Sequence, residues 1–454
     1  MNVIVACAAV AWAMVVYYQT STSAKVWLFS TSATEARVSY TSELNVTSEV
    51  VADFRKDDAT LTIALRDLSP GTRYVVAIVL VDNATNHTIP AKTLSLKTLA
   101  ATMSTVRFAF GSCTMAVPLL YPFTGLSVVY TCNRVLENRA AFLGFSGNLD
   151  YIATSLQPDF MLLLGDQVYA DIDFLAQDDT EHLYRATVHD HAYDTMGRTT
   201  PIFSIYDDHE IRNNWNEGQY DDRLYLDRIR YYDRFFGDRN PDPIVPGEHY
   251  YTWTTGVATF FMLDVVRKHA SPKDWPDGPH KTKLGPTQKQ HLLQWLVTST
   301  EPFKVVVSSM VVTDMGMQAT DEGWALYGTE YRQVFDFVNE HNVSGVVLLS
   351  GDLHFAGVWQ HSPYDFLFEV GASPISAFPV IPSKAAEAST HKTLFQSWTG
   401  LHFGHITIVD NAGDAGLYPA MDIAVYRSRL GQPVPAFSMR LNWEDTIPIK
   451  HNRT

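Results

Sequence analysis

Four separated segments of the sequence share one layout, an apolar run that ends in residues able to bind a metal ion. The runs and their following residues are 106–112 before Cys113, 160–165 before Asp166, 201–206 before Asp207 and Asp208, and 346–351 before Asp352 and His354. Such runs are typical of strands that are buried on both faces. In open α/β folds, neighbouring strand ends present their first loop residues to one crevice. We therefore expect these side chains to meet in a single site.

The residue types at these ends predict bound cations. Carboxylates that converge without a counter-charge repel one another and raise one another's pKa, and a multivalent cation removes that penalty. Asp166 and Asp352 each follow a glycine and would suit an ion between them. Oxygen ligands favour hard cations such as Ca²⁺ or Mg²⁺. A thiolate from Cys113 and a phenolate from Tyr169 favour a higher-valent transition metal, of which iron is the obvious candidate.

Each residue also has a purely structural interpretation. A single cysteine such as Cys113 is often a small buried apolar residue. Tyr169 taken alone is typical of a core aromatic. The pair Asp207 and Asp208 could cap a helix whose first turn carries His209. Asp171 either joins the site or flanks it.

Composition favours a folded, acidic protein. The 454 residues suffice for two or three domains, and 46% hydrophobic with 18% charged residues argues against disorder. The net charge of −15 argues against a stable nucleic-acid partner, which requires clustered Lys and Arg. A small phosphate ester is still compatible with that charge, because cations can lie between the ester and the carboxylates of the protein.

Residues 23–100 read as a separate β domain. Short β-branched and aromatic segments at 25–29, 35–40, 61–65 and 74–81 are separated by turn residues, without a helix-length pattern. This pattern predicts a β-sandwich. The stretch from Leu68 to Tyr74, Leu-Ser-Pro-Gly-Thr-Arg-Tyr, resembles the turn before a late strand in fibronectin type III domains.

Residues 101–454 have a different character. Apolar strands alternate with helical stretches such as 139–156 and 287–296, which predicts a layered α/β domain. From about Gly404 the sequence again has the pattern of strands, at 405–409 and 422–426, and this pattern predicts closing strands of the domain. The overall prediction is a multidomain protein, with an N-terminal β-sandwich followed by a layered α/β domain.

Several motifs, in order, resemble the PhoD-type alkaline phosphatase family, which belongs to the metallophosphoesterase superfamily. They are Ser-Cys at 112–113, Gly-Asp-Gln-Val-Tyr at 165–169, Asp-Asp-His-Glu at 207–210 with Asn-Asn-Trp at 213–215, Asp-Glu-Gly-Trp at 321–324 with Tyr327, and Ser-Gly-Asp-Leu-His at 350–354. The family has an N-terminal fibronectin-like domain, in agreement with the change of character near residue 100. The resemblance implies a metallophosphoesterase fold and hydrolysis of phosphomonoesters and diesters.

The resemblance also implies a site with Fe³⁺ and Ca²⁺, although other divalent metals would fit the ligands. Cys113, Asp166, Tyr169 and Asp352 are the implied ligands on the iron side, with Asp166 shared between ions. Asp208, His354 and Asn214 are the implied further ligands. His209 occupies the position of a histidine that contacts the leaving group, so His209 and Asp208 are the implied catalytic residues.

The N-terminus allows two interpretations. Residues 3–18 are apolar but shorter than the roughly 20 residues of a spanning helix, so no integral membrane span is expected. Residues 1–22 are either an export leader, although no basic residue precedes the run, or a first strand. Asn-x-Ser/Thr sequons at Asn45, Asn83, Asn86, Asn342 and Asn452 favour a secreted or extracytoplasmic location. We expect a monomer.

Two alternative functions use the same residues. One is a phosphodiesterase directed at phospholipids or nucleotides. The other is an inactive hydrolase shell that serves as a binding or adhesion protein. The intact charged residues at the strand ends disfavour the second alternative.

Overall fold

The computed structural model describes most of the chain. The described residues are 13–55, 58–85, 87–100, 102–115, 147–171, 180–215, 222–266, 270–315, 323–377, 379, 389–411, 418–428 and 432–448. Among these residues, no helix combines the length and the apolar character needed to cross a bilayer.

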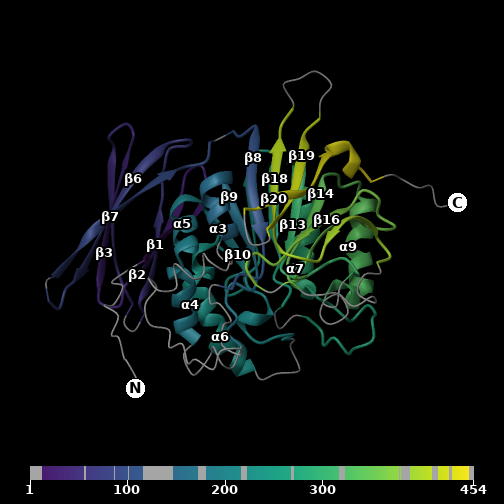
Figure 1. The fold of residues 1–454 in the computed structure, drawn as a ribbon, viewed down its shortest axis with the longest axis horizontal. Helices are drawn as coiled ribbons and strands as arrows, with labels where there is room; N and C mark the ends of the chain where they lie inside the picture. Colours follow the sequence, from purple (N-terminus) through teal and green to yellow (C-terminus); the bar gives the residue numbers. More distant parts are fainter. Residues whose placement is uncertain are drawn as a thin grey trace.

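Two antiparallel sheets form the N-terminal part of the fold (Figure 1). Their strands are β1 (Ala13–Gln19), β2 (Ala24–Phe29), β3 (Glu35–Ser42), β4 (Thr47–Asp53), β5 (Thr60–Leu65), β6 (Arg73–Asp82) and β7 (His87–Lys97). The sheet orders are β1-β2-β5 and β4-β3-β6-β7. Side chains that alternate toward the inside, such as Val38 on β3 and Val76 on β6, share one apolar cluster with Ile63 of β5. The strands expected at 25–29, 35–40, 61–65 and 74–81 are confirmed.

A six-stranded and a seven-stranded mixed sheet form the larger part of the fold. The first has the order β10-β9-β8-β18-β19-β20 and the second the order β11-β12-β13-β14-β16-β15-β17. The strands of the first are β8 (Thr105–Gly111), β9 (Phe160–Leu164), β10 (Ile202–Ile205), β18 (Leu401–Val409), β19 (Ala420–Ser428) and β20 (Val434–Asn442). Those of the second are β11 (Tyr251–Thr255), β12 (Ala258–Met262), β13 (Phe303–Ser308), β14 (Val346–Ser350), β15 (Ala356–Gln360), β16 (Phe368–Ala372) and β17 (Lys392–Ser397).

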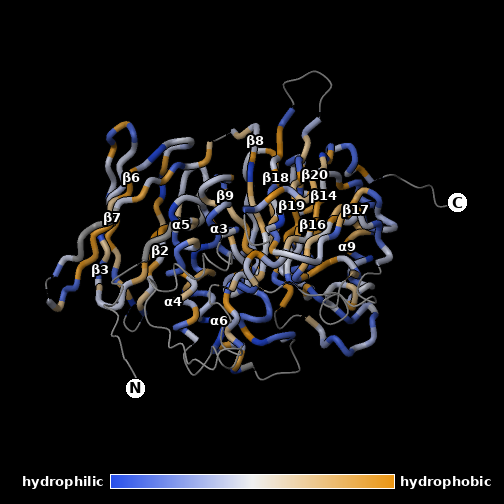
Figure 2. Tube along the Cα trace, in the orientation of Figure 1, coloured by the Kyte–Doolittle hydropathy of each residue, from blue (hydrophilic) through white to orange (hydrophobic). Residues whose placement is uncertain are grey.

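Parallel pairing occurs at the β10 edge of the six-stranded sheet and at the centre of the seven-stranded sheet. It joins β8 with β9 and β9 with β10 in one sheet, and β12, β13, β14 and β16 in the other. The expected closing strands are confirmed as β18 and β19, and β18 pairs with β8. Strands β9 and β14 are buried along their whole length, because each is covered on both faces. Figure 2 shows the corresponding hydrophobic colour on the central strands.

Helices flank the two sheets on opposite sides (Figure 1). The helices beside β8, β9 and β10 are α3 (Gly147–Tyr151), which continues as the π-helical turn Ile152–Leu156, α4 (Thr180–His189), α5 (His191–Thr199) and α6 (Asp222–Phe235). The helices on the other side are α7 (Gly285–Thr298) and α9 (Gly328–Glu340). The helix expected at 287–296 is confirmed within α7. Of the expected helix at 139–156, residues 139–146 lie outside the described residues.

Strand β2 packs against the larger part of the fold. Trp27 belongs to the apolar cluster of the two mixed sheets, and its indole N–H donates to the carbonyl of Arg234, at 2.9 Å. The guanidinium carbon of Arg239 lies 3.8 Å from the centroid of the Trp27 ring, a cation–π contact. The Lys25 ammonium donates to the carbonyl of Asn240, at 2.6 Å. These contacts fix the N-terminal sheets relative to the strand ends described next.

Candidate metal centre

The site lies where strand ends of both mixed sheets meet. Cys113 follows β8 and Asp166 follows β9, in the six-stranded sheet, whereas Asp352 follows β14 in the seven-stranded sheet. The expectation that these residues would come together is confirmed. The strand ends of one sheet do not form the site alone, because Asp352 comes from the other sheet. The backbone N–H of Asp352 donates to the Ser112 hydroxyl across the two sheets, at 2.9 Å.

Glycine allows the two sheets to approach this closely. A Cβ on Gly351 would lie 2.6 Å from the carbonyl oxygens of both Leu164 and Ser309, and 2.8 Å from the Cβ of Ser112. Real Cβ atoms do not approach backbone oxygens so closely. The glycine that precedes Asp352 is therefore a packing requirement of the site.

Unusual backbone geometry is concentrated at the site. Cys113, Asp166, Asp352 and His354 have positive φ angles of 59°, 55°, 61° and 51°. Residues other than glycine rarely adopt this left-handed backbone conformation, which costs about 1 kcal/mol or more for each residue. Such residues cluster at functional sites, where the surrounding structure holds them in place.

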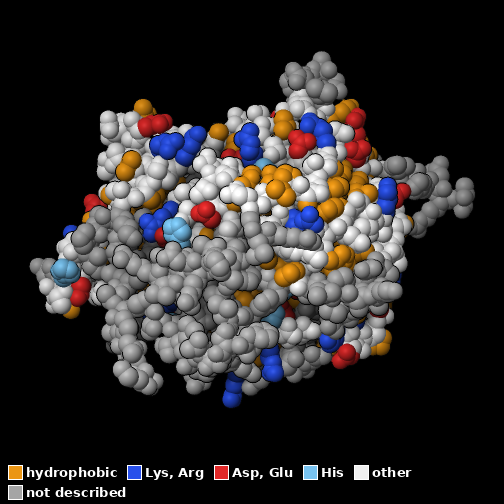
Figure 3. Space-filling model, viewed as in Figure 1, with side chains coloured by type: hydrophobic (Ala, Val, Ile, Leu, Met, Phe, Trp, Pro, Cys, Tyr) orange, Lys and Arg blue, Asp and Glu red, His pale blue; other side chains and the backbone are white. Residues whose placement is uncertain are grey.

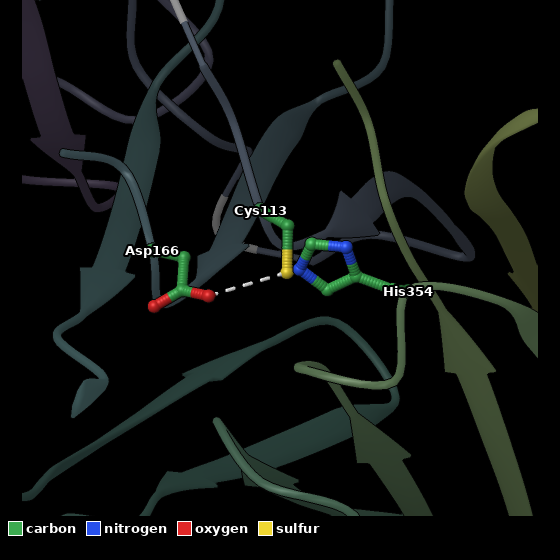
Figure 4. A group of neighbouring side chains, drawn as sticks. All are labelled: Cys113, Asp166 and His354. Carbon is green, nitrogen blue, oxygen red and sulfur yellow. Dashed lines mark hydrogen bonds between the residues drawn. The ribbon is translucent and has the colours of Figure 1, made fainter. Parts of the chain in front are cut away.

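One group of candidate ligands combines sulfur, oxygen and nitrogen. The Cys113 thiol donates to a carboxylate oxygen of Asp166, at 3.4 Å, and the three side chains of Cys113, Asp166 and His354 converge (Figure 4). One potential ligand atom from each lies within 4.8 Å of the others. The Tyr169 hydroxyl lies 3.2 Å from Nε2 of His354. Burial, with the charge of Asp352, raises the pKa of the Cys113 thiol to about 12, so a thiolate here requires a nearby cation.

The carboxylates form a second group. One oxygen each of Asp166, Asp208 and Asp352 is buried and accepts no hydrogen bond from the described residues. Burial and the charge of Asp208 raise the pKa of Asp352 to about 7, and burial raises that of Asp166 well above its ordinary value. Ligand atoms of Asp166, Asp207 and Asp352 again lie within 4.8 Å of one another. Buried oxygens without donors fit one or more bound cations, which would relieve both burial and repulsion.

Asp207 and Asp208 differ in their surroundings. Asp207 is the N-cap of the short 3₁₀-helix η2 (Asp208–Glu210), as the structural interpretation expected, and its carboxylate also accepts from the Ser309 hydroxyl, at 3.0 Å. Asp208 accepts a hydrogen bond from the backbone N–H of Asn214. Asn214 is half-buried on the following loop, with φ of 55°.

Asp171 pairs with His209. Nδ1 of His209 lies 2.8 Å from one oxygen of Asp171, and the other oxygen accepts from the backbone N–H of Asn213, at 2.7 Å. Ring centroids of His209 and Tyr169 are 4.3 Å apart. Burial alone would lower the pKa of His209, but the surrounding carboxylates, Asp166 first, raise it well above its ordinary value. The imidazole is therefore oriented by Asp171 and can carry a proton.

Two contributors were not expected from the sequence. The Ser373 hydroxyl donates to the sulfur of Cys113, at 3.1 Å, and Glu210 accepts from backbone amides of the loops after β9 and β10. Glu210 stands inside a recognised motif, whereas nothing in the sequence around Ser373 points to the site. Trp324 and Tyr327, from the motif at 321–327, are fully buried. Asp321, from the same motif, lies outside the described residues.

A second half-buried histidine, His249, lies beside the end of β10. The hydroxyl of Tyr206 donates to Asp264, at 2.8 Å, and Asp264 also faces Nδ1 of His249, at 3.6 Å. Nε2 of His249 lies 2.7 Å from Asp233. Burial alone would lower the pKa of His249, but the hydrogen bond to Asp233 and the nearby carboxylate of Asp264 raise it to about 9.

This cluster predicts a dependence of stability on pH. Because the folded-state pKa of His249 is raised from 6.5 to about 9, its stabilisation is complete below about pH 6.5 and is lost as pH rises through about 9. In chelator-treated protein, we expect wild type to lose about 1–3 kcal/mol of unfolding free energy over this range relative to His249→Gln. Urea unfolding at several pH values measures this. Parallel pH profiles of the two proteins would contradict it.

Comparison with known proteins agrees with the geometry. A family model described as PhoD-like phosphatase matches residues 128–408, more than half of the chain. Alkaline phosphatase D of Bacillus subtilis (strain 168) is 26% identical over 180 residues, which cover 34% of this chain and 31% of that protein. The chain thus matches about a third of the length of this relative.

Two solved structures share the fold over nearly the whole chain. A structure of PhoD superposes with a TM-score of 0.65 at 16% identity, and covers 94% of this chain and 92% of that one. Purple acid phosphatase PPD1 from yellow lupin (Lupinus luteus) seeds superposes with a TM-score of 0.64 at 15% identity, covering 96% and 75%. At these identities the likeness shows the fold alone.

Proposed function

Because the chain belongs to the PhoD-like phosphatase family, we propose that it hydrolyses phosphate esters with water at the site between the two mixed sheets. The observation that carries this proposal is that buried carboxylate oxygens converge with a thiol, a phenol and an imidazole, and that these oxygens accept no hydrogen bond from any described residue. Metal ions bound there would supply Lewis acidity, which polarises a phosphoryl group and lowers the pKa of water.

The donor groups suggest how two kinds of cation would be divided. Cys113, Asp166, Tyr169 and His354 offer the mixed sulfur, oxygen and nitrogen set that suits Fe³⁺. Asp166, Asp208 and Asp352 offer carboxylate oxygens that suit Ca²⁺ or another divalent ion, with Asn214 as a further candidate ligand. This proposal differs from the assignment that the resemblance implies, because it places His354 on the sulfur side and Asp352 on the carboxylate side, while Asp166 still serves both.

His209 is proposed to give its proton to the leaving oxygen. Its Nδ1 is held by Asp171, which leaves Nε2 as the atom able to act on a substrate, and neighbouring carboxylates favour the protonated ring. Asp208 precedes His209 in the chain and is proposed to act as a ligand of the cation on the carboxylate side. Asp171 is a positioning residue, because it reaches the reaction through His209.

Replacing His209 by Gln should lower kcat by about 10²- to 10⁴-fold while bound metal stays near the wild-type amount. The loss should be larger for an alkyl phosphate than for p-nitrophenyl phosphate, whose leaving group needs little protonation. Asp171→Asn should lose less, about 10-fold, because the histidine remains. Steady-state kinetics with both esters measures this. Equal losses with the two esters would contradict proton donation by His209.

The function is tested with purified protein, p-nitrophenyl phosphate and bis(p-nitrophenyl) phosphate, after elemental analysis of the bound metal. We expect turnover of at least one ester at neutral to alkaline pH, loss on chelation and recovery on addition of metal. Absence of turnover of both esters in metal-loaded protein would overturn the proposal. Substoichiometric metal in natively purified protein would instead support an inactive shell with a binding role.

We also infer a fibronectin type III-like module over residues 23–100, followed by a catalytic domain over residues 101–454. The two N-terminal sheets enclose an apolar cluster of their own. The hydroxyl of Tyr74 accepts a hydrogen bond from the backbone N–H of Ser69, at 2.7 Å. A tyrosine that bonds back to the chain a few residues upstream, at the start of a strand, is a hallmark of sandwich domains.

A secreted or extracytoplasmic location is part of the same proposal. The sequon residues Asn45, Asn83 and Asn342 are all exposed, which supports it. The described part of the apolar N-terminal run, Ala13–Gln19, pairs as β1 with β2, and residues 1–12 lie outside the described residues. Basic and acidic side chains are interspersed on the face shown in Figure 3, which suits a small phosphate ester better than a nucleic acid.

A further inference from the structure

One buried carboxylate joins two of the loops that carry the site. Glu210 is fully buried. Its Oε1 accepts the backbone N–H of Gln167, at 2.6 Å, and of Val168, at 3.0 Å. Its Oε2 accepts the backbone N–H of Asp166, at 3.1 Å, and of Asp207, at 2.9 Å. The first three amides belong to the loop after β9, and the fourth to the loop after β10.

These four contacts use the whole acceptor capacity of the side chain. An ionised carboxylate offers about four lone-pair positions, two on each oxygen, and each oxygen of Glu210 already accepts two N–H groups. Glu210 is therefore not a metal ligand, although it stands next to candidate ligands in the sequence. Buried backbone N–H groups need acceptors, and those at the ends of β9 and β10 find theirs in this one side chain.

The bridge constrains two candidate ligands together. Asp166 contributes its own amide to the bridge, and Asp208 directly follows Asp207, whose amide is also bound. The backbones of both loops are thereby tied to one rigid planar group. Asp166 and Asp208 belong to one ligand group with His209, in which the potential ligand atoms lie within 4.8 Å of one another.

We propose that Glu210 is a positioning residue that sets the separation of Asp166 and Asp208, and with it the spacing of the bound cations. This inference rests on the proposed metal-dependent function. Residues of this kind orient metal ligands through the hydrogen bonds they accept, and their loss typically costs 10- to 100-fold in metal affinity or activity. Glu210 acts entirely through other residues and touches no substrate.

Glu210→Gln tests the proposal with little change of shape. Either orientation of the amide turns its NH₂ group toward two backbone N–H donors, so two of the four contacts become repulsive. We expect metal affinity to fall about 10- to 100-fold, and kcat to fall by a similar factor at saturating metal. KM should change far less, since substrate contacts remain. Metal titration and steady-state kinetics measure these quantities.

Glu330→Gln is the matched control. Glu330 is also buried and also accepts two backbone N–H groups, from Lys283 at 2.5 Å and Leu284 at 3.1 Å, but at the start of α7. It should lose stability in a thermal melt while metal affinity and kcat stay near wild type. Wild-type metal affinity and kcat in Glu210→Gln, or equal losses of both in the two variants, would overturn the proposal.

Hydrogen exchange of the wild-type protein covers the case in which Glu210→Gln does not fold. In metal-free protein, the amides of residues 166–168 and 207 should exchange slowly, because their acceptor belongs to the protein. Rapid exchange of these amides, with the strands β9 and β10 still protected, would overturn the proposal. This measurement needs neither turnover nor bound metal. An inactive wild-type enzyme would therefore contradict the proposed function, whereas the exchange rates alone would decide whether Glu210 holds the two loops.

Discussion

Replacing Asp166 by Asn is expected to abolish metal binding and to lower kcat/KM by at least about 10³-fold, equivalent to about 4 kcal/mol of transition-state stabilisation. Asp166 belongs to all three groups of converging ligand atoms. One of its oxygens accepts from the Cys113 thiol, and the other is buried and accepts no hydrogen bond within the described part of the chain. Asparagine keeps the shape but removes the charge that a cation requires.

The same substitution has the opposite effect on the metal-free protein. Burial and the charges of Cys113 and Asp208 raise the pKa of Asp166 well above its ordinary value, although His209 opposes this. At pH 8 the ionised side chain is therefore unfavourable without a cation, and Asp166→Asn should melt at a higher temperature than chelated wild type. Elemental analysis measures bound metal, steady-state kinetics measures kcat/KM, and thermal melts with and without chelator measure the melting temperature.

The control for Asp166 is an aspartate outside the site, whose carboxylate binds backbone amides. Asp190 caps α5 by accepting from the N–H groups of Ala192 and Tyr193, at 3.0 and 3.2 Å. Asp190→Asn should lower stability by no more than about 1 kcal/mol and leave metal binding intact. Stoichiometric, wild-type metal in Asp166→Asn would refute the assignment of Asp166 as the shared ligand.

Gly165→Ala is expected to lower kcat/KM by at least about 10²-fold and to cost about 2–4 kcal/mol of unfolding free energy. Gly165 has a φ of 90°, and a Cβ there would lie 2.3 Å from the Cβ of Asp207 and 3.1 Å from its backbone nitrogen. Neither atom belongs to the far end of a flexible side chain. The two loops must separate, which pulls the amide of Asp207 away from Glu210.

Two other glycines divide this effect into its causes. Gly247 has a φ of 82° with no atom near an added Cβ, so Gly247→Ala carries backbone strain alone, about 1 kcal/mol. Gly278 has neither a positive φ nor a close neighbour, so Gly278→Ala should be near neutral. Denaturant unfolding and kinetics of all three variants compare them. If Gly165→Ala resembled Gly247→Ala and kept full activity, close packing of the two loops would not matter for the site.

Local pattern was sufficient to predict much of the fold. Apolar runs before Cys113, Asp166 and Asp352 predicted β8, β9 and β14, because strands covered on both faces must be apolar throughout. Helix periodicity predicted most of α7. Residue chemistry at the strand ends, with the family motifs, predicted which side chains would converge. All of these signals are local in the sequence.

Only the tertiary structure decided which loops face one another and what holds them. Asp352 and His354 arrive from a second sheet, and His354 joins the group of Cys113 rather than that of the carboxylates. The contacts of Glu210 with Asp166 and of Asp171 with His209 join residues far apart in the chain. Sheet order and the close approach permitted by glycines determine such pairings. A one-dimensional pattern of burial records that a residue is covered, but not which residue covers it.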